Sequence, residues 1–353
     1  MSDLFVIQIA DVSIAIESPG HEDSVANGAR THGTKTPSIE VVRGSSPSDK
    51  SSKIAEMARA TAASAAHATQ KFVIAHADDI GMCHGANTAF AAVAGKGFIA
   101  SGSVMVPCPW FREIAEMAAA NAQFDLGVHL TLTSEWQHYR WRPLTGSSKS
   151  SGLVDDDGYM WRTARAARDL AHPDAVEAEL RAQIDAAVAA GIDATHLDCH
   201  MGTALAAPFA DIYLRLGRDY RLPFLFPRHW DNYGAGLKLG DVDPARHAAR
   251  IADLEARGHP IIDRFVETPW AALGDADAYR RMIADIAPGL TFLALHPNHT
   301  GDIDVIDPPR ARCRISEAEL LRDPAFIADV RSHDLMLLGF RDMRDRLRAL
   351  GAL

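Results

Sequence analysis

Short apolar runs alternate with longer segments of helical pattern from Lys71 almost to the end of the chain. A short apolar run bounded by turn residues is typical of a buried strand, and alternation with helices favours parallel strands joined by crossover helices. Seven or eight such units predict an α/β fold of the TIM-like (β/α) barrel type, irregular if only seven strands form it, with a doubly wound sheet as the alternative. The expected strands are 72–77, 102–106, 126–132, 194–198, 224–226, 261–264, 291–295 and 335–338. The expected helices are 86–94, 109–121, 173–190, 208–220, 244–257, 276–286 and 324–332.

The first 70 residues differ from the rest and contain one aromatic residue, Phe5. Residues 4–16 predict a short strand or hairpin arm, residues 19–53 are rich in Gly, Ser, Thr, Pro and charge, and residues 54–70 are rich in Ala. Because such a segment buries too little apolar surface to offset its ordering entropy, we expect 1–70 to be a disordered or loosely structured extension. Residues 71–353 then form the barrel domain, with an insertion at about 134–172.

The composition excludes several classes of partner. A formal net charge of −10 and a pI near 5.9 argue against nucleic acid or an anionic membrane surface. The longest uninterrupted apolar stretch, 89–94, is far too short for a membrane helix, and the acidic start lacks the basic region of a secretory signal. The four cysteines form no CxxC pair, so we expect neither a zinc ribbon nor a disulfide framework. These features predict a cytoplasmic protein and leave a homodimer open.

Two adjacent carboxylates follow the first strand of the expected barrel. Asp78 and Asp79 come directly after the apolar run 72–77 and before a helical pattern. Neighbouring side chains of a strand point in opposite directions, and a sharp turn can re-aim one of them. One carboxylate could therefore bind a cation while the other stays free as a base. The alternative is a pair of helix N-caps.

Histidines lie near the ends of three other expected strands. His129 is in an apolar strand, where a buried core residue is the more common role. His196, Asp198 and His200 occupy every second position and so share one face of a strand, which is costly to bury without a cation or hydrogen bonds. The alternative for this group is a polar strand end that faces water. His296 ends a very apolar strand, and its alternative is likewise contact with solvent.

These clusters share one location in the expected fold. The carboxyl ends of parallel strands are where barrel active sites are built. An Asp and two His from different strands suit one divalent cation with open positions. A spare carboxylate and a spare imidazole would then supply the base and the acid of metal-assisted hydrolysis.

The motifs resemble those of the YdjC-like (ChbG/HpnK) carbohydrate deacetylases. The family pattern reads N-A-D-D-F-G, then G-x-H-L-x-L-T, then T-H-x-D-S-H, and later H-P at the end of a strand. The corresponding text here is HADDIG at 76–81, GVHLTLT at 127–133, THLDCH at 195–200 and HP at 296–297. This chain departs from the pattern in three places, with His76 for Asn, Ile80 for Phe and Cys199 for Ser. The resemblance covers roughly residues 71–350.

The resemblance implies a TIM-like barrel and a hydrolase of carbohydrate metabolism that acts on carbon–nitrogen amide bonds. The substrate would be an acetylated amino sugar or a chitooligosaccharide-like oligosaccharide, and the cofactor one divalent metal ion, Mg²⁺ or Zn²⁺. Asp79, His129 and His200 correspond to the metal ligands. Asp78 corresponds to the general base, and His296 to the group that protonates the leaving amine.

Further residues are expected to support the site or contact the substrate. Asp198 and His196 share the polar strand face, and Asp198 is expected to hold a histidine tautomer from behind the metal. The insertion contains Trp136, Arg140 and Trp141. Flat aromatic faces can cover the apolar face of a sugar ring, and arginine can bind its polar groups. The alternative is that these residues form the insertion's own small core.

Two rival functions remain open at this point. One is a metallophosphoesterase with the same Asp/His shell, although no Gly-rich phosphate cradle is visible. The other is a non-catalytic sugar-binding barrel, against which the intact Asp78–Asp79 pair argues.

Overall fold

The computed structural model describes residues 4–9, 12–17, 69–95, 97–146, 148–230 and 239–351. The predicted Gly/Ser-rich stretch 19–53 and nearly all of the Ala-rich segment 54–70 lie outside these residues. The chain divides into two units, Met1–His67 and Ala68–Leu353. In the first unit, β1 (Leu4–Ile9) and β2 (Val12–Glu17) pair as an antiparallel hairpin.

The second unit is built on a parallel sheet with the strand order β6-β5-β4-β3-β8-β7. The central strand, β3, pairs with β8 along one of its edges. Along the other edge, its first three residues pair with β9 and residues near its end pair with β4. Burial on both faces explains why this strand reads as an apolar run, with Val73, Ile74 and Ala75 fully buried. The strands are β3 (Lys71–Ile80), β4 (Ser101–Val104), β5 (Leu126–Leu130), β6 (Leu197–Cys199), β7 (Arg264–Glu267), β8 (Gly289–Leu295) and β9 (Leu335–Leu337).

The sheet curls as a TIM-like barrel does, which confirms the predicted fold class. Single parallel bridges, Leu197–Phe224 and Pro227–Ile262, continue the pairing from β6 towards β7. The expected strand 224–226 is therefore reduced to isolated bridges, and the expected strand 261–264 begins later, as β7. Both segments are apolar enough to be buried, but only a few of their backbone groups take part in the ladder.

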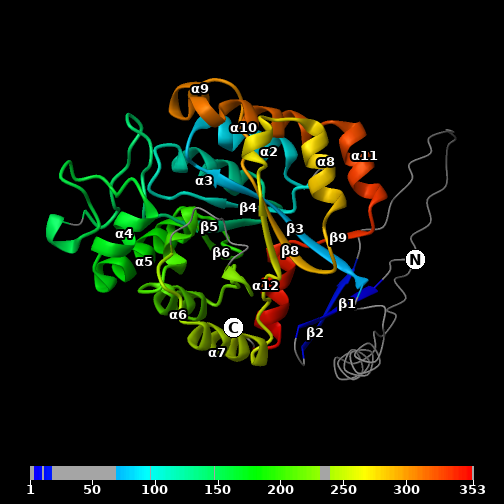
Figure 1. Ribbon diagram of the computed structural model, residues 1–353, viewed down its shortest axis with the longest axis horizontal. Coiled ribbons are helices and arrows are strands. Elements are labelled where there is room, and N and C mark those ends of the chain that lie inside the picture. The colour runs from blue at the N-terminus through cyan, green and yellow to red at the C-terminus, as the bar shows by residue number, and fades with distance from the viewer. Residues whose placement is uncertain are drawn as a thin grey trace, which may run out of the picture. The chain divides into compact units, whose positions relative to one another are not determined.

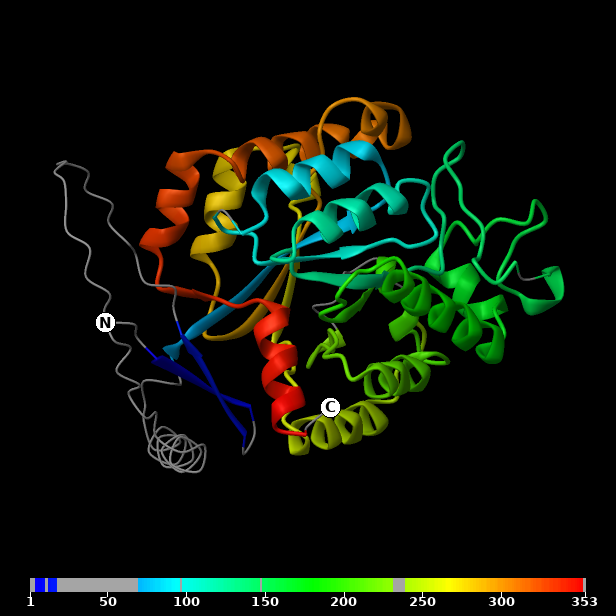
Figure 2. The ribbon, with the colours of Figure 1, turned by 180° about the vertical axis from the view of Figure 1, so that it is seen from behind.

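Helices surround the curled sheet. Figures 1 and 2 show α2, α3, α8, α10 and α11 above the strands and α5, α6 and α7 below them. The helices are α2 (His84–Val93), α3 (Phe111–Ala120), α4 (Ala164–Leu170), α5 (Pro173–Ala189), α6 (Ala210–Tyr220), α7 (Pro244–Ala256), α8 (Ala276–Ala284), α9 (Asp302–Ile306), α10 (Pro308–Leu320), α11 (Pro324–Ser332) and α12 (Phe340–Ala349). No helix in the described part of the chain combines the length and the apolar character that crossing a membrane requires.

Local sequence signals explain several helix starts. Asp243 and Asp323 precede α7 and α11, and each side chain accepts a hydrogen bond from a backbone N–H of the first turn. A proline follows each aspartate at the first helical position, where its missing N–H would have no partner anyway. Between β5 and α5, the chain forms the short 3-10 helix η2 (Lys149–Ser151) and α4.

Candidate active site

The end of β3 brings two adjacent carboxylates into one cavity. Asp78 and Asp79 both line a cavity of about 370 Å³. The register between β3 and β4 shifts between Ala77 and Ile80, and Asp79 has a left-handed backbone with a φ of 61°. Aspartate is one of the few residues other than glycine that adopt this conformation readily. The irregularity breaks the alternation of the strand and turns the second carboxylate towards the same cavity as the first.

Asp79 faces two histidines from other strands of the sheet. His129 lies in β5, and His200 follows β6 at the start of the 3-10 helix η3 (His200–Leu205). Nε2 of His129 is 3.5 Å and Nδ1 of His200 is 3.1 Å from Oδ1 of Asp79. All three side chains are buried, and Oδ1 of Asp79 has no hydrogen-bond partner among the described residues. An unpaired buried oxygen beside two imidazole nitrogens is a donor set that fits one divalent cation.

A carboxylate lies behind each of these histidines. Nδ1 of His129 is 2.9 Å from Oγ of Ser103 and 3.0 Å from Oδ1 of Asp198, and Ser103 donates its hydroxyl hydrogen to Asp198. Nε2 of His200 is 3.0 Å from Oε2 of Glu135. Each contact places the ring hydrogen on the nitrogen that faces away from the cavity, so the other nitrogen offers a lone pair there. Both histidines are therefore held in the tautomer that a metal ligand requires.

The charges around these histidines also favour a cation. Burial alone would lower the pKa of His200, but Glu135 and Asp79 raise it to about 9. Burial would likewise lower the pKa of His129, but Asp198 and Asp79 hold it well above its usual range. Both shifts arise because buried carboxylates stabilise positive charge nearby. The cavity therefore attracts positive charge, either as protons on the rings or as a metal ion.

Arg314 of α10 supplies part of the compensating charge. Its Nη1 lies 2.8 Å from Oδ2 of Asp79, and both side chains are buried. Burial alone would raise the pKa of Asp79, but Arg314, His129 and His200 hold it well below its usual range. Asp79 is thus ionised, with one oxygen bound to the guanidinium and the other turned to the histidines.

Asp78 lies within reach of two further histidines. Its Oδ1 is 2.6 Å from Nδ1 of His76, and its Oδ2 is 3.9 Å from Nε2 of His296. Nδ1 of His296 is 2.8 Å from Oγ1 of Thr268, whose hydroxyl hydrogen is donated to Glu317. The ring hydrogen of His296 is therefore on Nδ1, and Nε2 carries a lone pair. Burial lowers the pKa of His296 to about 4, so the ring is neutral at neutral pH.

The residues expected to contact substrate from the insertion divide into two groups. Trp136 lines the cavity. Trp141 is almost completely buried, and its indole N–H donates to the carbonyl of Thr133. The guanidinium of Arg140 is bound to Asp155 and to a backbone carbonyl. Neither Trp141 nor Arg140 is among the described residues that line the cavity. Trp141 packs behind it, with its ring 6.4 Å from that of His200, whereas Arg140 binds partners within the insertion.

Residues 72–332 match the family model described as YdjC-like protein. The chain belongs to the YdjC-like family.

Several relatives of this YdjC-like chain are named as deacetylases. A carbohydrate deacetylase from Thermus thermophilus is 41% identical over 235 residues, which cover 64% of this chain and 77% of the relative. A carbohydrate deacetylase from Thermoanaerobacter pseudethanolicus is 22% identical over 270 residues, with coverages of 76% and 98%. A chitooligosaccharide deacetylase from Yersinia enterocolitica is 29% identical over 163 residues, with coverages of 45% and 61%.

A solved structure supports the fold of the YdjC-like chain. It comes from Enterococcus faecalis and is described as that of a candidate cellobiose-phosphate cleavage protein. It superposes with a TM-score of 0.61 at 19% identity, over 78% of this chain and 99% of the other. At this identity the likeness concerns the fold alone.

The YdjC-like site also uses residues that no motif indicated. Glu135 lies two residues beyond the GVHLTLT motif, and Ser103 lies in β4, where nothing marks it as different from other small strand residues. Arg314 and Glu317 lie on α10, and their partners in the site, Asp79 for Arg314 and Thr268 for Glu317, are far away along the chain. Their burial could have been suspected from the helical period, because both charges share the helical face of the buried Ala311 and Ala318.

Proposed function

We propose that this chain is a metal-dependent carbohydrate deacetylase, which hydrolyses the N-acetyl group of an amino sugar or of a chitooligosaccharide-like oligosaccharide. The observation that carries the proposal is the meeting of two different carboxylates in one cavity. Asp79 is ionised and turns its second oxygen towards one nitrogen each of His129 and His200, while Asp78 stands outside that group. The names of the relatives supply the substrate class, and the arrangement of the site supplies the chemistry.

Asp79, His129 and His200 would hold one divalent ion, Zn²⁺ or Mg²⁺. Two imidazoles and one carboxylate suit zinc and do not exclude magnesium. When bound, such an ion would polarise the acetamide carbonyl and lower the pKa of a water molecule towards 7. Arg314 keeps Asp79 ionised, and the carboxylates behind the histidines keep both rings in the ligand tautomer.

Asp78 and His296 would move the protons of the reaction. Asp78 takes a proton from the attacking water, because its Oδ2 is not engaged by His76. His296 is neutral in the resting site, and its Nε2 lone pair lies 3.9 Å from that oxygen. The imidazole can therefore collect the proton and deliver it to the departing nitrogen. Thr268 and Glu317 fix the ring through Nδ1 and stabilise the imidazolium while it exists.

The cavity walls suit a sugar ring. Trp136 and Trp270 both line the cavity, and the ring of Trp270 lies 4.8 Å from that of His296. An indole face can cover the apolar face of a pyranose. A volume of about 370 Å³ is at the lower end of the range for small-ligand pockets, which fits a small number of sugar residues.

An acetate-release screen tests the proposed function. The full chain is loaded with Zn²⁺, Mg²⁺, Mn²⁺ or Co²⁺ and offered N-acetylated mono- and oligosaccharides, with a phosphomonoester in parallel. We expect acetate from at least one sugar, in proportion to the metal content measured by mass spectrometry. Phosphate release without acetate would identify a metallophosphoesterase, and ligand binding without turnover would identify a sugar-binding barrel.

The two aspartates then separate the roles within the site. Asp79→Asn is expected to lose most of the bound metal, because a neutral amide replaces an anionic ligand. Asp78→Asn is expected to keep the metal and to lower kcat by about 100- to 10,000-fold, the usual contribution of a positioned base. Loss of metal from Asp78→Asn alone would reverse the two roles.

A further inference from the structure

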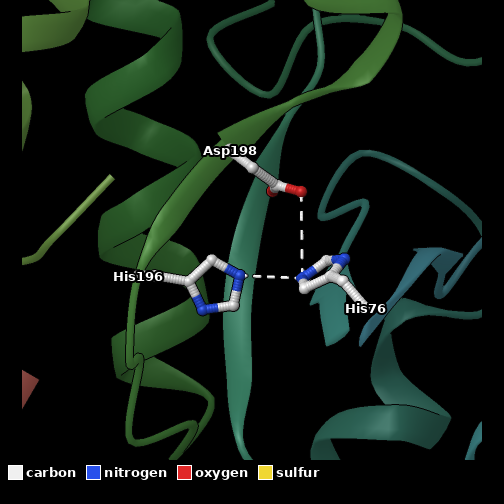
Figure 3. Close-up of side chains that lie close together, drawn as sticks. All are labelled: His76, His196 and Asp198. Atoms are coloured by element: carbon white, nitrogen blue, oxygen red, sulfur yellow. Dashed lines mark hydrogen bonds and ion pairs between the residues drawn. The ribbon is translucent and has the colours of Figure 1, made fainter. Parts of the chain in front are cut away.

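His76, His196 and Asp198 form a buried group (Figure 3), and His76 contacts Asp78. His76 lies in β3, His196 directly precedes β6, and Asp198 is in β6. Figure 3 shows an Nε2 nitrogen of one imidazole turned to that of the other, with the Asp198 carboxylate to one side. The two Nε2 atoms are 2.9 Å apart, whereas Oδ2 of Asp198 is 3.9 Å from Nε2 of His76.

The distances restrict where the hydrogens of this group can lie. Nδ1 of His76 is 2.6 Å from Oδ1 of Asp78, which requires a hydrogen between them. The 2.9 Å between the two Nε2 atoms holds one further hydrogen, so one ring donates and the other accepts. Whichever ring donates to the other through Nε2, Nδ1 of His76 is free to donate to Oδ1 of Asp78. A chain of hydrogen bonds thus runs from His196 through His76 to Asp78.

Packing prevents both rings from turning away. The ring of His196 stacks on Phe340 with a centroid distance of 3.8 Å and an interplanar angle of 16°. On its other side it meets Gly127, where an added Cβ would come within 2.5 Å of the ring atoms. The ring of His76 lies 4.8 Å from that of Phe292. The two rings therefore give Asp78 a rigid hydrogen-bond partner.

A second metal ion would be the rival interpretation of this group, since its ligand atoms lie within 4.8 Å of one another. The hydrogen bonds argue against it. Every ring nitrogen of His76 and His196 has a hydrogen-bond partner among the described residues. Oδ1 of Asp79, in contrast, has no such partner. Oδ2 of Asp198 accepts the hydroxyl hydrogen of Ser103 and stays 3.9 Å from His76.

We propose that the His76–His196 pair positions the general base: His76 binds Oδ1 of Asp78 and thereby leaves Oδ2 as the oxygen that accepts the proton from water. The proposal rests on the proposed function. His76 is a positioning residue, because it touches neither the reacting atoms nor the three ligand atoms of the metal group. Without this hydrogen bond, the carboxylate could rotate about its Cβ–Cγ bond, and neither oxygen would be held towards the cavity.

Two amide variants of His76 test which of its nitrogens matters. Asparagine, the residue usual in the family pattern, places an amide near the position of Nδ1 and can still donate to Asp78. Glutamine reaches towards the position of Nε2 and keeps a partner for His196 instead. We expect His76→Gln to lower kcat roughly 10- to 100-fold, the loss of one charge-assisted hydrogen bond. We expect His76→Asn to restore most of that loss, with KM and metal content unchanged in both.

The outcomes that would overturn the proposal are separate from those that concern the proposed function. Equal kcat values for the Asn and Gln variants would show that the hydrogen bond from Nδ1 does not contribute to catalysis. A fall from two bound ions to one in either variant would show that the group is a second metal site. Melting temperatures show whether a variant has merely unfolded.

A spectroscopic measurement decides the hydrogen bonding without any activity. ¹⁵N-histidine NMR of the full chain, assigned with His76→Asn, is expected to show a hydrogen on Nδ1 of His76. An unprotonated Nδ1, or a ring that exchanges between tautomers, would refute the positioning role even in an inactive protein. A wild type that releases no acetate would refute the proposed function alone.

Discussion

The contact between Glu135 and His200 offers a sharp test of the metal group. Nε2 of His200 lies 3.0 Å from the Glu135 carboxylate, whose side chain is only 19% exposed. Glu135→Gln keeps the size of the side chain and an acceptor oxygen, but removes the negative charge. The hydrogen bond that fixes the ring then survives in a neutral form. The variant therefore isolates the electrostatic support that the carboxylate gives to the ligand.

The expected size of the effect follows from this geometry. A hydrogen bond to a charged group is worth about 1.5–3 kcal/mol, roughly twice a neutral one. Replacing the carboxylate by an amide forfeits about half of that, and each 1.4 kcal/mol is a factor of ten. We expect Glu135→Gln to weaken metal binding about 3- to 12-fold, near the lower end of the 10- to 100-fold usual for partners of metal-bound histidines.

The assay is competition for the metal with a chelator of known affinity at fixed pH and ionic strength. Glu113→Gln is the matched control, because Glu113 lies 2.8 Å from Nδ1 of His84 in an exposed pair outside the cavity. We expect the control to bind metal as the wild type does. A metal affinity of Glu135→Gln that equals that of the control would refute the idea that Glu135 supports a metal ligand.

Three further predictions concern stability and domain organisation. Gly127→Ala should lower the free energy of unfolding by about 1–3 kcal/mol in chemical denaturation, because its Cβ would come within 2.5 Å of the His196 ring; an unchanged midpoint would show that the ring can move. Burial lowers the pKa of His259 to about 3, so between pH 6.5 and 3 the unfolded chain binds a proton at this residue and the folded chain does not. The free energy of unfolding is therefore unaffected by this group above pH 6.5 and falls as the pH drops below 6.5. His259→Gln should therefore flatten the dependence of stability on pH by about 1.4 kcal/mol per unit just below pH 6; equal slopes for variant and wild type would contradict the burial argument. A chain that begins at Ala68 should keep its metal content and acetate release, since every residue of the site lies in Ala68–Leu353, and an inactive product would show that Met1–His67 is required.

The sequence was sufficient for those parts of the site that are coded locally. An apolar run that ends in a carboxylate or histidine identifies both a strand and its functional end, and Asp79, His129 and His200 do meet around one point. The fold class follows from the same alternation of strands and helices. The assigned chemical roles of these residues stay predictions until the variants are measured.

Other features depended on tertiary contacts that no local pattern encodes. Glu135 and Arg314 reach the site from an irregular segment and from a late helix, and their partners lie 65 and 235 positions away. The strand expected at 224–226 is apolar but forms only isolated bridges, because pairing depends on the neighbouring chain as well as on burial. The burial of Trp141 also depends on a tertiary contact, because its indole N–H donates to the carbonyl of Thr133, which directly precedes the insertion.

The left-handed backbone of Asp79 limits how this protein can evolve. At a φ of 61°, glycine, asparagine and aspartate are accommodated readily, whereas glutamate and cysteine carry a larger steric cost in their own backbone. Position 79 is therefore restricted twice, by the donor that the cavity needs and by the conformation that aims it. A library randomised at this codon should yield well-folded clones with asparagine or glycine, while glutamate and cysteine are depleted before any selection for activity. The substitutions that the backbone accepts most readily, asparagine and glycine, thus remove the carboxylate that we propose as a metal ligand.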